Sequence, residues 1–136
     1  MKIHHLFISH SWSHSNHYKG LVELLKKKNR FYFSDYSVPK DDPIHNAGSD
    51  SELKAAIKNK MALCGTILIL AGVYSTYSKW IDIEINLAQK GFISPKPIIA
   101  IKPWASTNTS IPVKEAANRI VGWNTDPIVN AIRELS

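Results

Sequence analysis

The chain has 136 residues, a length that fits one domain and can bury a hydrophobic core without disulfides or metal. Its composition, 44% hydrophobic and 21% charged, is close to the globular average and excludes a disordered or low-complexity chain. The net charge of +6 allows nucleic acid as a partner, but we expect none, because the basic cluster of Lys26, Lys27, Lys28 and Arg30 falls at the end of a predicted helix, where cations offset the helix dipole.

The first half of the chain predicts two strands, one helix and a long loop. Residues 3–9 are mostly apolar and end in the polar run 9–16, a pattern typical of a buried strand followed by a loop. In residues 18–28 the apolar side chains recur at helical spacing, which predicts the first helix. Residues 31–33 predict a short aromatic strand, and residues 34–50, with two prolines and four aspartates, predict a loop. Loops of this length in small domains are commonly functional.

The middle of the chain alternates helix and strand. Residues 51–61 predict a modest helix, and the aliphatic run 66–70 predicts a strand that is buried on both faces. Residues 78–90 predict a strongly patterned helix, and residues 97–101 predict another strand.

The last part of the chain predicts a short helix over residues 113–118 and a final strand over residues 119–121. Asp126 is then expected to cap a terminal helix that has Pro127 at its first position and runs through Leu135.

Hydrophobic strands that alternate with helices indicate a single α/β domain over residues 1–136. We predict a flavodoxin-like, doubly wound, five-stranded parallel sheet with helices on both faces. In such sheets ligands bind at the carboxyl ends of the strands, near the point where the strand order reverses. This rule places the loop at residues 9–11, the 34–50 loop and the start of the 78–90 helix around one crevice.

The compartment is expected to be the cytoplasm. A single cysteine, Cys64, lies in an apolar stretch and is expected to be a buried hydrophobe in a reducing compartment. The first eight residues lack the features of a secretion signal. The longest apolar run, residues 66–73, is far shorter than the ~20 residues that span a bilayer, so we expect no membrane partner.

Glu84 occupies an unusual place on the 79–90 helix. On a helical wheel the polar side chains gather on one side: Lys79, Asp82, Asn86, Gln89 and Lys90. The opposite arc is apolar: Trp80, Ile81, Ile85, Leu87 and Ala88. Glu84 falls in the middle of this apolar arc and is the only charge there.

A carboxylate on an apolar face must be paired, protonated or next to a cavity, because burying an uncompensated charge is costly. Two structural explanations compete with a functional one: a pair with a Lys or Arg, or a position in water just past the sheet edge. Trp80, one turn earlier, could shield the acid and form a wall for a flat ligand.

Two segments carry a family resemblance. Phe7-Ile8-Ser9-His10-Ser11 ends the first strand, and Ser78-Lys79-Trp80-Ile81-Asp82-Ile83-Glu84 opens the later helix. Their order and spacing resemble the first box and the Ser-x-Trp-x-x-x-Glu segment of TIR domains. Three further segments are similar to the TIR-like branch that includes the TIR protein of bacterial Thoeris antiphage systems: Tyr36-Ser37-Val38-Pro39, Asp42-Pro43-Ile44 and Val121-Gly122-Trp123-Asn124.

This resemblance implies an enzyme that consumes NAD, with Glu84 as the catalytic residue. The residues that it implies for binding the substrate are Phe7, Ser9, His10, Ser11, Ser37, Asp42 and Trp80. NAD would be the substrate rather than a cofactor, and cleavage of its nicotinamide-ribose bond would yield ADP-ribose or a cyclic isomer. The Thoeris-type resemblance favours a cyclic messenger that acts on a separate effector protein when phage infects. TIR domains can also self-associate.

The sequence also allows four other interpretations. The main alternative is a non-catalytic TIR scaffold that acts by self-association, in which Glu84 is a structural acid. A flavodoxin is disfavoured because the serine-rich segment after the first strand lacks the glycine of a phosphate loop. A response-regulator receiver is disfavoured as well. It needs an acidic pair after the first strand and an aspartate at the end of the third strand, where this chain has Ser9-His10 and Leu70-Ala71. His10, His14 and His17 have spacings compatible with zinc, but we expect no metal, because these residues belong to a loop and an exposed helix start.

Overall fold

The structure is a computed structural model that describes residues 3–9, 15–36, 50–70, 79–102 and 111–135. At residues 15–18, 50, 53, 79–82 and 111–112 it describes the backbone alone.

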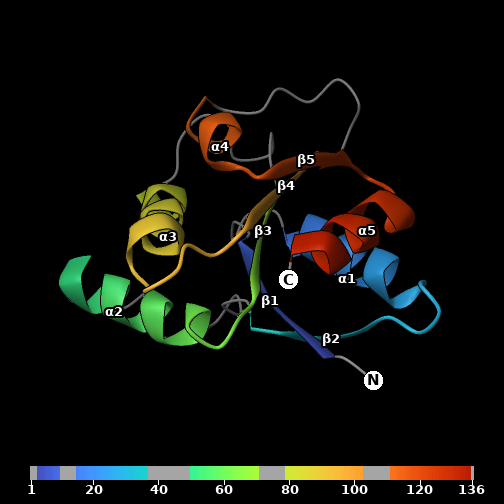
Figure 1. Ribbon diagram of the computed structural model, residues 1–136, viewed down its shortest axis with the longest axis horizontal. Helices are drawn as coiled ribbons and strands as arrows, with labels where there is room; N and C mark the ends of the chain where they lie inside the picture. The colour runs from blue at the N-terminus through green and yellow to red at the C-terminus, as the bar shows by residue number, and fades with distance from the viewer. Residues whose placement is uncertain (1–2, 10–14, 37–49, 71–78, 103–110, 136) are drawn as a thin grey trace.

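One five-stranded sheet forms the centre of the fold (Figure 1). Its strands are β1 (Ile3–Ser9), β2 (Tyr32–Asp35), β3 (Thr66–Leu70), β4 (Ile98–Lys102) and β5 (Arg119–Gly122). They lie in the order β2-β1-β3-β4-β5, and every neighbouring pair is parallel. The strand order therefore reverses between β1 and β3, as it does in flavodoxin-like sheets. The predicted fold class is confirmed.

Helices cover both faces of the sheet. They are α1 (Ser15–Lys26), α2 (Asp50–Met61), α3 (Lys79–Lys90), α4 (Ile111–Ala116) and α5 (Thr125–Leu135). Helix α1 packs beside α5 on one face, and α3 packs between α2 and α4 on the other (Figure 1). None of these described helices has the length and apolar character needed to cross a membrane.

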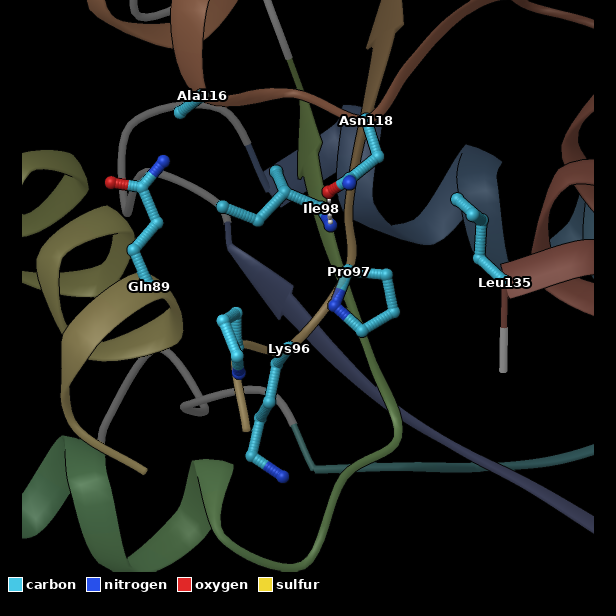
Figure 2. Close-up of a pocket in the computed structure, with 8 residues that line it drawn as sticks. Gln89, Lys96, Pro97, Ile98, Ala116, Asn118 and Leu135 are labelled. Carbon is cyan, nitrogen blue, oxygen red and sulfur yellow. Dashed lines mark hydrogen bonds between the residues drawn. The ribbon is translucent and has the colours of Figure 1, made fainter. Parts of the chain in front are cut away.

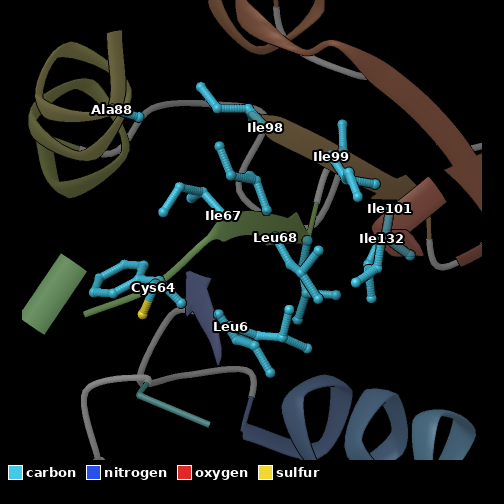
Figure 3. Packing of buried hydrophobic residues seen from close by; sticks show 14 of the residues in the cluster. Leu6, Cys64, Ile67, Leu68, Ala88, Ile98, Ile99, Ile101 and Ile132 are labelled. Atoms are coloured by element: carbon cyan, nitrogen blue, oxygen red, sulfur yellow. The ribbon is translucent and has the colours of Figure 1, made fainter. Parts of the chain in front are cut away.

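The hydrophobic core is continuous across the sheet and includes residues from both helical layers (Figure 3). All five residues of β3 are buried, as the aliphatic run predicted. Parallel strands covered on both faces have no solvent side, which explains why their sequences are apolar without alternation. Cys64 belongs to this core with 3% of its surface exposed, and its thiol is free. Burial raises the pKa of Cys64 to about 12, although the nearby Lys96 lowers it.

Polar contacts join the two helices on the α1 and α5 face. The Thr125 hydroxyl donates to the Leu24 carbonyl oxygen at 2.8 Å. Lys28 Nζ lies 2.9 Å from Asp126 Oδ1, in an exposed ion pair that contributes at most about 1 kcal/mol. The hydroxyl contact ties the start of α5 to the last turn of α1, and the ion pair ties it to Lys28 just beyond that helix.

The predicted end of the first helix is wrong by two residues. The sequence predicted residues 18–28, whereas α1 runs from Ser15 to Lys26. The helix also starts three residues earlier than predicted, because Ser15, Asn16 and His17, which suggested a loop, form its first turn, and polar residues of this kind suit helix starts. After α1 the chain reverses direction through Arg30, whose φ of 62° lies in the left-handed region.

Other boundaries shift by one or two residues, which is usual where helix and strand ends fray. The observed elements differ from the predicted ones at β2 (32–35, not 31–33), α2 (from 50, not 51), α3 (from 79, not 78), β4 (98–102, not 97–101), α4 (111–116, not 113–118) and β5 (to 122, not 121). Helix α5 begins at Thr125, so Asp126 lies inside the helix and Pro127 follows at its third residue.

Candidate functional site

Ser9 lies at the carboxyl end of a central strand of the sheet. It is the last residue of β1, which is paired with β2 on one side and β3 on the other. In this register Ser9 lies opposite Ile69 of β3, at the reversal of strand order where flavodoxin-like folds bind ligands. Its side chain is 3% exposed.

Glu84 lies on the buried face of α3, as the helical wheel predicted. Its side chain is 5% exposed. Among its helical neighbours Ile85, Leu87 and Ala88 are buried, whereas Asn86 and Gln89 are exposed. The explanation in which Glu84 lies in water past the sheet edge is therefore wrong.

The Ser9 and Glu84 side chains form a hydrogen bond. Burial raises the pKa of Glu84 to about 7, and the hydrogen bond from Ser9 partly opposes that rise. Within the described part of the chain, no Lys or Arg forms an ion pair with Glu84, and its Oε2 atom is buried without a hydrogen-bond partner. The carboxyl is thus held by one hydroxyl, and one of its oxygens is left to accept a further hydrogen bond.

The remaining predicted site residues are described to different extents. Phe7 is 1% exposed and belongs to the core, on the same face of β1 as Ser9 because side chains alternate along a strand. Trp80 lies one helical turn before Glu84 in α3, and its side chain is outside the described residues. Four others lie wholly outside them: His10, Ser11, Ser37 and Asp42. Their binding roles stay predictions.

Two pockets in the described part of the structure lie away from Ser9 and Glu84. One of about 430 Å³ opens at the amino end of β4 and is lined by Gln89, Pro95, Lys96, Pro97, Ile98, Ala116, Asn118 and Leu135 (Figure 2). There the Asn118 side chain accepts a hydrogen bond from the Ile98 amide at 2.8 Å. A second, of about 640 Å³, lies between α1 and the edge strand β2. Neither is lined by Ser9 or Glu84, and the first is at the sheet end opposite the carboxyl ends where such folds bind ligands.

The zinc alternative falls on residues that the structure describes incompletely. His10 and His14 are outside the described residues, and only the backbone of His17 is described. Among the side chains that are described, no group of three His, Cys, Asp or Glu residues is arranged to hold a metal ion.

Sequence reasoning missed the contact between Ser9 and Glu84. Both residues were candidates, but Ser9 was expected to donate to the substrate. The two residues are 75 positions apart, and only the packing of α3 on the sheet brings them together. No periodicity or motif reports such a contact.

The parallel sheet, the buried glutamate of α3 and the polar end of β1 together define a TIR-like domain of flavodoxin-like architecture. More particularly, the chain belongs to the family of the Thoeris protein ThsB, TIR-like domain, whose sequence profile matches residues 7–108. A search of curated proteins returned no match. Family membership supports a TIR-type role in antiphage defence.

Proposed function

We propose that the protein binds NAD and cleaves its nicotinamide-ribose bond, with Glu84 as the catalytic carboxylate. The observation that carries this proposal is the state of Glu84, which is buried and hydrogen-bonded by Ser9 at the switch point of the sheet, and whose Oε2 has no hydrogen-bond partner among the described residues. Buried carboxyls with perturbed pKa values cluster at functional sites. Membership of a TIR-like family supports this reaction class.

The reaction needs little acid catalysis, because the leaving group departs as a neutral molecule. When the bond between ribose C1′ and the pyridinium nitrogen breaks, its electron pair leaves with nicotinamide, which becomes neutral, and the ribose becomes oxocarbenium-like. A carboxylate close to the sugar stabilises that positive charge and accepts hydrogen bonds from ribose hydroxyls, as in glycoside hydrolysis. Glu84 Oε2 is suited to accept such a hydrogen bond.

The cation is then captured by a nucleophile, which loses a proton. Water gives ADP-ribose, whereas a ribose hydroxyl or an adenine nitrogen of the same molecule gives a cyclic isomer. We favour cyclisation, in which the cytoplasmic product signals to a separate effector protein, because the family is that of a Thoeris TIR-like protein. NAD serves as substrate in this scheme, with no resident cofactor.

The first test is replacement of the carboxylate. Glu84→Gln should lower nicotinamide release from NAD by at least about a hundredfold, because the amide cannot stabilise the cation electrostatically. Chromatography of NAD, nicotinamide, ADP-ribose and cyclic products measures this loss and identifies the product. The matched control is Glu23→Gln, which removes an exposed carboxylate from α1 on the other face of the sheet and should leave turnover unchanged.

The assay needs both purified protein and protein mixed with extract of phage-infected cells, so that a trigger is supplied. Unchanged turnover in Glu84→Gln would exclude the proposed role. Wild-type protein that neither binds nor consumes NAD in either condition, yet forms oligomers in size-exclusion chromatography, would favour the scaffold alternative instead.

The pH dependence gives a second test. With the Glu84 pKa raised to about 7, the carboxylate fraction of the free enzyme rises through neutral pH. We therefore expect kcat/KM for NAD to increase tenfold per pH unit below about pH 7 and to level off above it. A profile that is flat between about pH 5 and pH 8 would contradict catalysis by ionised Glu84.

A further inference from the structure

Ser9 and Glu84 are two polar side chains that the fold buries together. Ser9 is 3% exposed, Glu84 is 5% exposed, and their side chains are hydrogen-bonded. Ser9 is fixed by β-ladder pairing on a central strand, whereas Glu84 projects from a helix that packs on the same sheet. A short side chain on a fixed backbone therefore contacts a longer side chain that has more rotatable bonds.

The direction of the hydrogen bond follows from the chemistry. An ionised carboxylate has no proton to give, so the Ser9 hydroxyl must donate its single hydrogen to that form. A hydrogen bond donated by the hydroxyl favours the carboxylate over the acid and therefore lowers the pKa of Glu84, against the larger effect of burial. While Ser9 donates to Glu84, the same hydrogen is unavailable to a phosphate or ribose of the substrate.

The two carboxyl oxygens of Glu84 are not equivalent. Oε2 has no hydrogen-bond partner among the described residues, so the bond from Ser9 must be to Oε1. A buried acceptor without a partner costs free energy in the free protein, and that cost is removed when a ligand donates to it. The asymmetry leaves Oε2 as the oxygen that can accept a hydrogen bond from a ligand.

We propose that Ser9 is a positioning residue for Glu84: it donates to Oε1, fixes the orientation of the carboxylate and leaves Oε2 to meet a ribose hydroxyl of the substrate. The proposal rests on the proposed function for the identity of that substrate. It replaces the expectation that Ser9 binds NAD directly. It makes Ser9 contribute to the chemical step rather than to the affinity for NAD.

Two Ser9 variants and one control separate this role from a structural one. Ser9→Ala removes the donor, and Ser9→Thr keeps the hydroxyl. The control, Thr66→Val, deletes a buried hydroxyl whose Oγ1 has no partner among the described residues, at the opposite end of the sheet from Ser9. Should Ser9→Ala not fold, Ser9→Cys offers a near-isosteric side chain that is only a weak donor.

The first readout does not depend on activity. Titration of ¹³C-labelled glutamate side chains by NMR without NAD, with the Glu84 signal assigned by its loss in Glu84→Gln, measures its pKa in each variant. Ser9→Ala should raise this pKa by about one pH unit, Ser9→Thr should restore it, and Thr66→Val should leave it unchanged. A Glu84 pKa that is the same in Ser9→Ala and in the wild type would overturn the proposal.

The second readout is steady-state NAD turnover. Ser9→Ala should lower kcat about tenfold with less than about a twofold change in KM, and its pH profile should move upward with the Glu84 pKa. A raised KM with unchanged kcat would show that Ser9 binds the substrate, and would overturn the proposal. If the wild-type protein consumes no NAD, the proposed function fails while the NMR titration still decides whether Ser9 controls Glu84.

Discussion

At the scale of single residues, Glu84 links the site to the stability of the protein. Its pKa is about 7 in the folded chain and 4.5 in the unfolded reference. Between these values the folded state holds a proton that the unfolded state has lost, so the free energy of unfolding falls as pH rises. The stabilisation is complete below about pH 4.5 and is lost as the pH rises through about 7.

Glu84→Gln should remove this dependence. The interval from 4.5 to about 7, at about 1.4 kcal/mol per pH unit, corresponds to roughly 3 kcal/mol. Relative to the wild type, the variant should therefore gain stability between pH 4.5 and pH 8 by up to that amount, as measured by urea unfolding. Glu23→Gln, at an exposed position of α1, should follow the wild type. If the free energy of unfolding depended on pH in the same way in Glu84→Gln and in the wild type, the raised pKa of Glu84 would be contradicted.

The sequence predicted the burial of Glu84 but not its contact with Ser9. The burial of Glu84 followed from helical periodicity, because a side chain in the middle of an apolar arc is carried to the core with its neighbours. The contact with Ser9 did not follow, because the distance between a strand end and a helix face depends on how the layers pack. The unequal roles of Oε1 and Oε2 depend on single atoms, which no residue pattern encodes.

At the scale of elements, the end of α3 is tightly constrained. A Cβ atom at Gly91 would lie 2.7 Å from the Leu87 carbonyl oxygen, and the Gly91 amide donates to that same oxygen at 2.8 Å. The close approach of the two backbones requires glycine here, two turns after Glu84. Any larger residue must displace the last turn of the helix.

Gly91→Ala should lower the free energy of unfolding by about 1–3 kcal/mol, because the contact involves backbone atoms that cannot rotate away. Gly122→Ala in β5 is the matched control: its nearest neighbour, Asn124 Nδ2, would lie 3.8 Å from the new Cβ, and the change should be within about 0.5 kcal/mol. Chemical denaturation of both variants measures the difference. Equal effects would mean that the backbone at Gly91 relaxes freely.

The elements themselves were predicted more accurately than their ends. Strands buried on both faces, such as β3, appear as continuous apolar runs and were found at their correct residues. The edge strand β2 was ended too early, because Ser34 and Asp35 are polar. Backbone pairing with His5 and Leu6 of β1 extends the strand through them, and such pairing does not depend on side-chain polarity.

At the scale of the whole molecule, the core joins both helical layers through the sheet. Buried residues of β1, β3, β4 and all five helices belong to one cluster. A single core without an internal boundary favours cooperative unfolding.

We therefore predict one thermal transition for residues 1–136, with equal calorimetric and van't Hoff enthalpies. Differential scanning calorimetry measures both. Two resolved transitions, or a van't Hoff enthalpy well below the calorimetric value, would show that the described core unfolds in parts.

The buried thiol of Cys64 can report on unfolding, because it reacts with reagents only when the core opens. With a pKa of about 12 and 3% of its surface exposed, the sulfur is neither ionised nor reachable in the native state, so alkylating reagents must wait for the chain to open. Because it is the one cysteine in the sequence, every labelled molecule reports on the same place, the turn between α2 and β3. The rate of labelling therefore measures how often the core becomes exposed, and it can be measured in a crude mixture without any assay of function.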